Sequence, residues 1–450
     1  MFGATEFRIR LFVLRATFGV ALLVGPAMAA AQAPLPIVDK DFHLGVASCA
    51  GSTCHGAVQP WQGSRVMQNE FITWQRDDKH AKAYQVLLND RSKRIARNLG
   101  LEAAHTAKVC LDCHADNPPQ ERQHRTFQIT DGVSCEACHG GAGRWIGVHI
   151  SAAATHKLNV ENGLYPSDDP VNRARLCLSC HFGDETRFVT HRIMGAGHPR
   201  MSFELDTFTA IMPAHFKVDD DYRQRKGSWD GVQTWAIGQA MAIGFVMDAM
   251  VDPKRGRDGI FPELVLFDCY TCHHRMSNLR WAPRASVGLG PGIPRISDAN
   301  LLMLQIIAAQ VDAPLGKELG AKTLALHKAT RTSNAALLEA AKALKVVTDK
   351  LVDKFVQHNF AKADMSALLA GVIDLGLDGE YQDYPGAEQA TMALSAIINA
   401  MLDVGAIDKK QFEPLNAALE KSYAAVEKDE EYSPQAFVAA LKEFKAKVPK

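Results

Sequence analysis

The sequence has no cysteine after Cys272, no excess of either charge and no apolar run long enough to cross a membrane. Lys and Arg total 50, as do Asp and Glu, and this balance argues against a nucleic-acid-binding protein. The most apolar internal stretch, residues 235–250, contains Gln239 and Asp248 and is shorter than the about 20 residues of a spanning helix. The mature protein is therefore expected to have no transmembrane span. The 47% of hydrophobic residues predict a globular chain.

The N-terminus has the pattern of an export signal. Three arginines form a basic region, and residues 16–24 are apolar. Ala27-Met28-Ala29 resembles the small-residue pattern at which signal peptides are cleaved. A membrane anchor is the alternative, but Arg15 and Pro26 limit the apolar stretch to about half the length that spanning needs. We therefore predict a cleaved signal peptide over residues 1–31 and a periplasmic protein. Its removal takes away three Arg and one Glu, which changes the net charge from zero to −2.

The ten cysteines fall into five pairs, and a histidine follows each second cysteine. Four pairs have the form Cys-x-x-Cys-His: CLDCH, CEACH, CLSCH and CYTCH. This is the motif of covalent haem attachment, because two thiols must bond to one porphyrin while the next imidazole reaches its iron. Redox-active or zinc-binding cysteine pairs would not explain a histidine at the same offset five times. The predicted haem-attaching cysteines are Cys110, Cys113, Cys135, Cys138, Cys177, Cys180, Cys269 and Cys272, together with the pair described next.

The remaining pair lies in CAGSTCH, where Cys49 and Cys54 are separated by four residues. We interpret it as a long-spacer attachment site; a disulfide between the two cysteines is the alternative. The sequence then predicts five covalently bound haem c groups. The five iron-binding histidines of the motifs are His55, His114, His139, His181 and His273.

Each iron also needs a ligand on its other side, and most of the 17 histidines lie in the same part of the chain. Ten of them compete for five positions, so about half must have other roles. His43, His105, His124 and His215 rank lower on sequence context. The preferred candidates are His80, on a predicted helix; His149 and His156, two helical turns apart; His191 and His198, which bracket a glycine-containing segment; and His274, whose ring would project away from the haem of His273.

The predicted fold is mainly α, with a loop-rich multihaem cytochrome core over residues 41–282 and an all-α helical bundle over 297–450. A Gly- and Pro-rich linker over 283–296 separates them. Residues 235–250 are expected to form one buried helix. Helices in the bundle are indicated by an apolar stripe from Leu337 to Phe355, by a stretch over 388–404 that stops at Gly405, and by a helix that begins at Ser433-Pro434.

The segments GVSCEACHGGAG, CLSCHFGD and MGAGHPRMSFEL resemble the multihaem cytochrome c-554 family, over about residues 45–215. The resemblance implies stacked haem pairs, with His80 as the second ligand of the third haem and His149 or His156 as that of the fourth. It also implies one five-coordinate haem, on Cys110 and Cys113. The fifth motif and the cysteine-free tail depart from the tetrahaem type, which leaves the physiological partner open.

Two functions are compatible with these motifs. Histidine on both faces of each iron would give an electron-transfer protein, because no iron position stays open for a substrate. The alternative is an oxidoreductase that acts on a small nitrogen or sulfur oxyanion at one five-coordinate haem. The absence of a Cys-x-x-Cys-Lys motif favours electron transfer. Haem propionates would make the protein acidic, so we expect redox partner proteins with a basic docking surface. The sequence does not define the oligomeric state.

Overall fold

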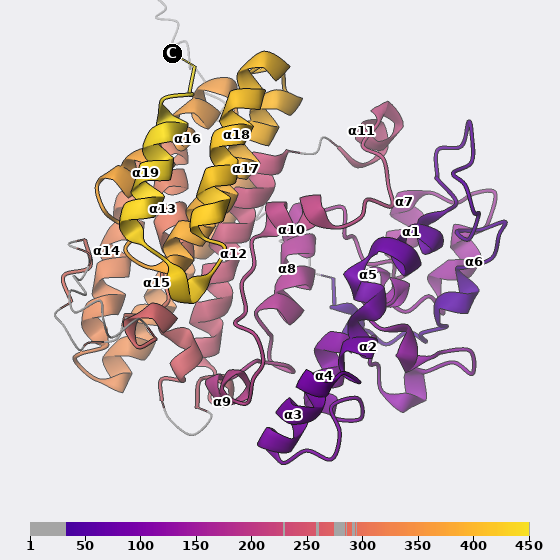
Figure 1. The fold of residues 1–450 in the computed structure, drawn as a ribbon. Helices are drawn as coiled ribbons and strands as arrows, with labels where there is room; N and C mark the ends of the chain where they lie inside the picture. The colour runs from indigo at the N-terminus through magenta and orange to yellow at the C-terminus, as the bar shows by residue number, and fades with distance from the viewer. Residues whose placement is uncertain are drawn as a thin grey trace, which may run out of the picture. The chain divides into compact units, whose positions relative to one another are not determined.

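The computed structural model describes residues 33–227, 230–257, 261–273, 284, 286–289, 293 and 295–449. Over these residues the secondary structure consists of helices, with only three isolated β-bridges (Figure 1). The prediction of a mainly α fold is therefore confirmed. The predicted signal peptide and His274 lie outside the described residues.

The part of the chain up to residue 227 consists of short helices joined by long loops. Its separate apolar cluster is small and contains only Leu87, Ala96, Ala104, Leu111 and Ala115 as buried members. Such a region needs other apolar material to fill it, and porphyrins would supply it. The α-helices are α1 (Glu70–Asp77), α2 (Ala83–Val86), α3 (Asp90–Leu99), α4 (Lys108–His114), α5 (Cys135–His139), α6 (Trp145–His149), α7 (His156–Glu161), α8 (Pro170–His181), α9 (His191–Gly195), α10 (Leu205–Ile211) and α11 (Asp220–Lys226).

The C-terminal part forms the predicted helical bundle. The apolar stripe of α15 is buried at Leu344, Leu351 and Phe355. Ser433 caps α19 by accepting a hydrogen bond from the backbone of Ala436, and Gly405 follows α17 with a φ of +68°. The helices are α13 (Ala299–Val311), α14 (Ala313–Ala329), α15 (Asn334–Gln357), α16 (Lys362–Leu377), α17 (Tyr384–Asp403), α18 (Lys409–Ala425) and α19 (Pro434–Lys445).

Helix α12 (Gly231–Val251) connects the two parts. At 21 residues this helix is longer than the predicted stretch 235–250, so the judgement that it is too short to span a membrane was wrong. However, 72% of its most apolar window is buried inside the protein. It packs against α15, α13 and α17 of the bundle and against α8 and α10 of the N-terminal part (Figure 1). Buried residues of α12 and of the bundle belong to one hydrophobic core. These contacts identify α12 as a core helix.

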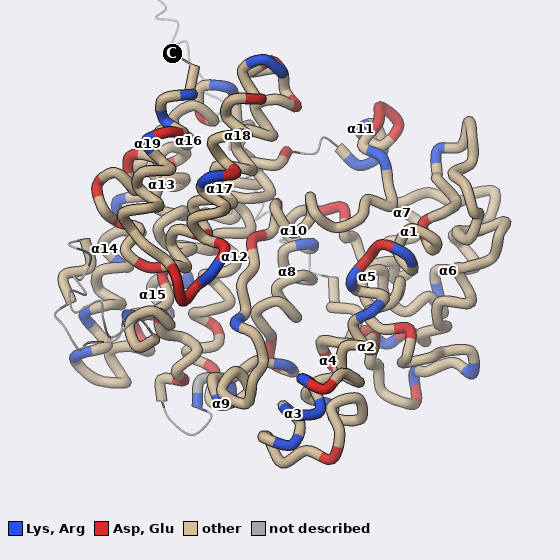
Figure 2. Tube along the Cα trace, in the orientation of Figure 1, with Lys and Arg blue, Asp and Glu red and all other residues tan. Residues whose placement is uncertain are grey.

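The predicted linker, residues 283–296, is described only in part. Arg284 and Ile296 in it are 2% and 0% exposed, so these side chains are packed. The division of the chain at this segment stays a prediction. Charged residues of both signs are interspersed along the described chain (Figure 2).

Candidate functional site

Three of the cysteine motifs lie at the ends of short helices. Residues 110–114, 135–139 and 177–181 form the last turn of α4, the whole of α5 and the last turn of α8. In an α-helix, residues three and four apart share one face, so the two thiols and the histidine of each motif point to the same side. This is the arrangement that one porphyrin requires.

The long-spacer motif reaches the same backbone relationship by a different route. In the motif that begins at Cys269, the amide of His273 donates to the carbonyl of Cys269 at 2.7 Å. In the motif that begins at Cys49, the amide of His55 donates to the carbonyl of Cys49 at 3.1 Å. The two additional residues lie in a turn that is closed by a hydrogen bond from the amide of Gly56 to the carbonyl of Gly51, at 2.9 Å. The histidine of the long-spacer motif therefore returns to the first cysteine as it does in the short motif.

Each of the five motif histidines faces one histidine from elsewhere in the chain. Two imidazoles bound on opposite sides of one metal ion, with metal–nitrogen bonds of about 2 Å, have ring centres about 6 Å apart. The observed distances between ring centres are 5.9 Å for His55–His149, 6.4 Å for His114–His198, 6.4 Å for His139–His215, 6.2 Å for His181–His80 and 6.1 Å for His273–His191.

Hydrogen bonds at the Nδ1 atoms orient several of these rings. Nδ1 of His55 lies 2.9 Å from Glu70 Oε2, and Nδ1 of His80 lies 3.0 Å from Asp78 Oδ1. Nδ1 of His114 and of His198 lie 3.1 Å and 2.8 Å from backbone carbonyl oxygens. An Nδ1–H that donates to an oxygen leaves Nε2 as the unprotonated, metal-binding atom. These oxygen acceptors favour the tautomer in which Nε2 is free, which is the form that an iron between the rings would need.

Burial keeps the motif histidines of α5 and α8 neutral. It lowers the pKa of His139 to about 3 and that of His181 to about 4, because the charged imidazolium is poorly solvated in these positions. A neutral imidazole is the form that binds metal ions. The chemistry of the donor set thus fits haem iron, and the paired thiols fit its covalent attachment.

Of the preferred candidates, four lie opposite motif histidines: His80, His149, His191 and His198. His80 lies opposite His181 of the fourth motif rather than the third, and His149 opposite His55 of the first. His149 ends α6 and His156 begins α7, so the two do not share one helix face. Nε2 of His156 lies 2.9 Å from Asp168 instead.

Sequence context ranked His215 among the lower candidates, although its ring lies opposite that of His139. It lies in the loop after α10, outside any helical register, and no local signal distinguishes it. The lower-ranked His43 is 0% exposed and lies between Asp116 and Asp39. His105 contacts Tyr84, and Nδ1 of His124 lies 2.7 Å from Thr126 Oγ1.

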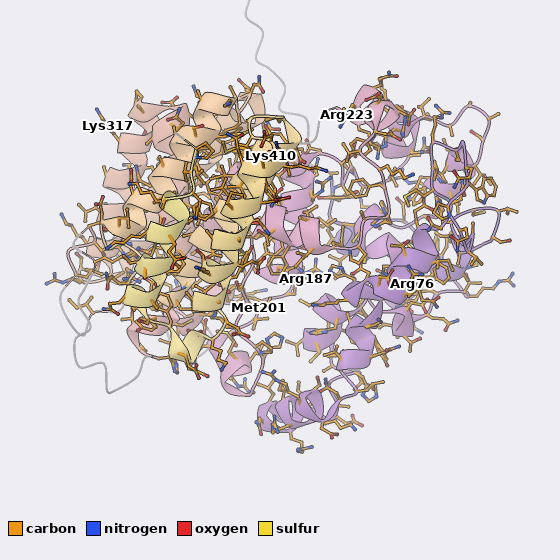
Figure 3. The ribbon with its side chains drawn as sticks, turned by 45° about the horizontal axis from the view of Figure 1, so that its top comes forward. Arg76, Arg187, Met201, Arg223, Lys317 and Lys410 are labelled. Carbon is orange, nitrogen blue, oxygen red and sulfur yellow. The ribbon has the colours of Figure 1, made fainter. Side chains whose placement is uncertain are left out.

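The thiols bring different motifs together. Cys49 forms a hydrogen bond with Cys135, which lowers the pKa of Cys49. Cys113 and Cys180 form a hydrogen bond of the same kind, which lowers the pKa of Cys180. Arg187, labelled in Figure 3, joins the second and fourth motifs: its guanidinium donates to the carbonyl of Asp112 and to Ser179 Oγ, both at 2.6 Å. The motifs are therefore neighbours in space although they are distant in the sequence.

Comparison with known proteins gives one family. Residues 48–140 match the family described as cytochrome c554 and c-prime, within the stretch that carries the resemblance in the sequence. The matched residues include the motifs that begin at Cys49, Cys110 and Cys135. The chain is a c-type cytochrome that resembles this family, with covalently bound haem c and a role in electron transfer. No curated protein and no solved structure gave a significant match.

Proposed function

We propose that this chain, a c-type cytochrome resembling the cytochrome c554 family, carries five haems and conducts electrons through them between redox partner proteins. The five opposed pairs of imidazoles support this proposal most strongly. When bound, each haem supplies one iron that accepts and releases a single electron. The motif histidine and the histidine opposite it would hold that iron, and the hydrogen bonds at Nδ1 of His55, His80, His114 and His198 would orient their rings.

Two histidines on each iron would favour electron transfer over catalysis. An enzyme that acts on a nitrogen or sulfur oxyanion would need one open iron position. The resemblance suggested such a position at the motif of Cys110 and Cys113, but His198 lies opposite His114 there, at a ring-centre distance of 6.4 Å. We therefore propose that all five irons are six-coordinate.

The contacts between motifs suggest one order of electron flow. The thiol contacts link the first motif to the third (Cys49 to Cys135) and the fourth to the second (Cys180 to Cys113). Cys138 of the third motif lies close enough to Cys177 and Cys180 of the fourth that a negative charge on either thiol would raise its pKa. We propose a chain of haems in the order first, third, fourth and second.

The fifth haem would continue this chain from the second. Its proposed ligand His191 begins α9, and His198, the proposed ligand of the second haem, follows the same short helix. The first and fifth haems are then the two ends of the chain, where electrons would enter and leave.

We further propose that the protein works in the periplasm, on the basis of the signal peptide predicted over residues 1–31 and the typical location of the family. The negative net charge expected of the mature holoprotein supports partners with a basic docking surface. Their association should then slow as ionic strength rises.

The haem count tests the proposal. The intact mass of the purified protein should correspond to the mature chain plus five haems, and Cys54→Ala should lose covalent attachment at the first motif alone. The matched control is Cys113→Ala, in a short-spacer motif, which should affect one haem in the same way. Four haems in the wild type, together with a Cys49–Cys54 disulfide, would refute the long-spacer site.

A further inference from the structure

The residue before the fifth motif controls the turn that carries its cysteines. Asp268 is 4% exposed. Its Oδ1 accepts a hydrogen bond from the backbone amide of Tyr270 at 3.2 Å, and its Oδ2 accepts one from Thr271 Oγ1 at 2.9 Å. These bonds form the cap of the short helical turn Cys269–Thr271. The carboxylate of Asp268 therefore fixes the backbone from which Cys269 projects.

Arg295 connects this carboxylate to the C-terminal bundle. Its guanidinium donates to Asp268 Oδ2 at 2.8 Å and to Asp383 Oδ2 at 2.7 Å, and its carbonyl accepts from the amide of Asp268 at 2.8 Å. Asp383 in turn caps α17, because its Oδ1 accepts from the amide of Gly386 at 2.8 Å. One buried side chain thus joins the cap of the haem-attaching turn to the cap of a bundle helix.

The same end of α17 also holds the segment that follows His198. Arg200 donates to Glu388 Oε2 at 2.9 Å, and the amide of the Gln389 side chain donates to the carbonyl of Phe203 at 3.1 Å. Met201, labelled in Figure 3, lies in this segment. The ring of Tyr270, inside the fifth motif, lies 6.3 Å from that of Tyr432 in the bundle.

The opposite ligand of the fifth haem has a related support. Glu263, which is 1% exposed, accepts from the amide of His191 at 3.0 Å and from the amide of Val265 at 2.9 Å. It therefore joins the first residue of α9 to the loop that leads into the fifth motif. Both sides of the fifth site are held by buried carboxylates.

Stability alone does not explain such a network. Buried ion pairs lose much of their attraction to desolvation, and apolar residues of similar volume often stabilise a core equally well. Here the charged groups connect two specific backbone turns, and hydrogen bonds behind a ligand are known to tune a metal site. A positioning role follows from this geometry.

We propose that Arg295 is a positioning residue for the fifth haem, and that the C-terminal bundle builds the site of this haem. The inference rests on the proposed function, specifically on haem attachment at Cys269 and Cys272. It gives the cysteine-free tail a role in the redox centre, beyond packing or partner docking.

Full-length variants test this role. Arg295→Gln should lose the fifth haem from the intact mass or, where the haem is still attached, shift the midpoint potential of one haem while four stay unchanged. Arg295→Lys, which keeps the charge, should restore part of the wild-type haem content or midpoint potential. The matched control is Arg255→Gln: Arg255 is likewise a buried arginine in an ion pair, with Asp252 at 3.0 Å, but it follows α12 and is not part of the Asp268–Arg295–Asp383 connection, so this variant should keep five haems and the wild-type redox titration.

Asp268→Asn provides a second route if Arg295→Gln does not fold, because the amide oxygen can still cap the turn while the ion pair is lost. The Asp268→Asn variant should shift the midpoint potential of one haem in the redox titration. Wild-type behaviour of both the Arg295→Gln and the Asp268→Asn variants, or equal effects of the Arg255 and Arg295 variants, would overturn the inference. The Cys269→Ala/Cys272→Ala variant separates the two proposals: an unchanged haem count in it would refute haem attachment at the fifth motif itself.

Discussion

The imidazole of His215 faces that of His139 with ring centres 6.4 Å apart, although helices α6 to α10 separate them in the sequence. We predict that His215→Ala converts one haem from low-spin to high-spin and lets the reduced protein bind carbon monoxide, because one iron loses its second ligand. His215→Met should instead keep that haem six-coordinate and raise its reduction potential.

Optical and electron paramagnetic resonance spectra of the ferric protein measure both effects. His156→Ala is the matched control, since His156 pairs with Asp168 and faces no motif histidine, and its spectra should equal those of the wild type. Wild-type spectra for the His215→Ala variant would show that another residue binds the third iron.

The buried pair of His43 and Asp116 predicts a dependence of stability on pH. Burial by itself would lower the pKa of His43, but hydrogen bonds to Asp116 and Asp39 outweigh it and raise the pKa to about 10. Glu136 also lies near the ring, and Arg122 binds Asp39. A raised folded-state pKa stabilises the fold fully below about pH 6.5, and this stabilisation is lost as the pH rises towards 10.

The contribution is on the order of 5 kcal/mol. Denaturant unfolding at several pH values should show the free energy of unfolding falling between pH 6.5 and 10 in the wild type. This fall of the unfolding free energy with pH should be smaller in His43→Gln and unchanged in His124→Gln, whose side chain is exposed. Equal slopes in the wild type and His43→Gln would contradict a charged His43.

Two glycines of α12 test how closely this helix packs against the N-terminal part. A Cβ atom at Gly238 would lie 2.6 Å from Cβ of Leu205 in α10, whereas one at Gly244 would come no closer than 3.7 Å to Lys345. We expect Gly238→Ala to lower the free energy of unfolding by about 1–3 kcal/mol through overpacking. Gly244→Ala should raise it by up to about 1 kcal/mol, because alanine favours helix. Thermal unfolding measures both, and equal effects would argue against the α10–α12 contact.

The sequence predicts what depends on local spacing. The cysteine motifs place their thiols and histidine within one or two turns of chain, and the caps at Ser433 and Gly405 act on adjacent residues, so both can be recognised without the fold. The same holds for α15, whose apolar stripe repeats every three or four residues.

The proposed second ligands depend on tertiary structure. His80 lies opposite the fourth motif and His149 opposite the first because folding brings α8 and the Cys49 loop to them, and no local pattern encodes this. His215 has no helical context at all. The connection of Arg295 to Asp268 is likewise hidden in a Gly- and Pro-rich stretch that has the composition of a linker.

The most direct test of the account is the spin state of the ferric protein with its full haem complement. Five opposed histidine pairs predict that the ferric spectrum is wholly low-spin, that the reduced protein does not bind carbon monoxide, and that cyanide or nitrite leaves the spectrum unchanged. A high-spin haem that binds nitrite and reduces it, and that is lost when His114 is altered, would contradict the account and identify the chain as an enzyme.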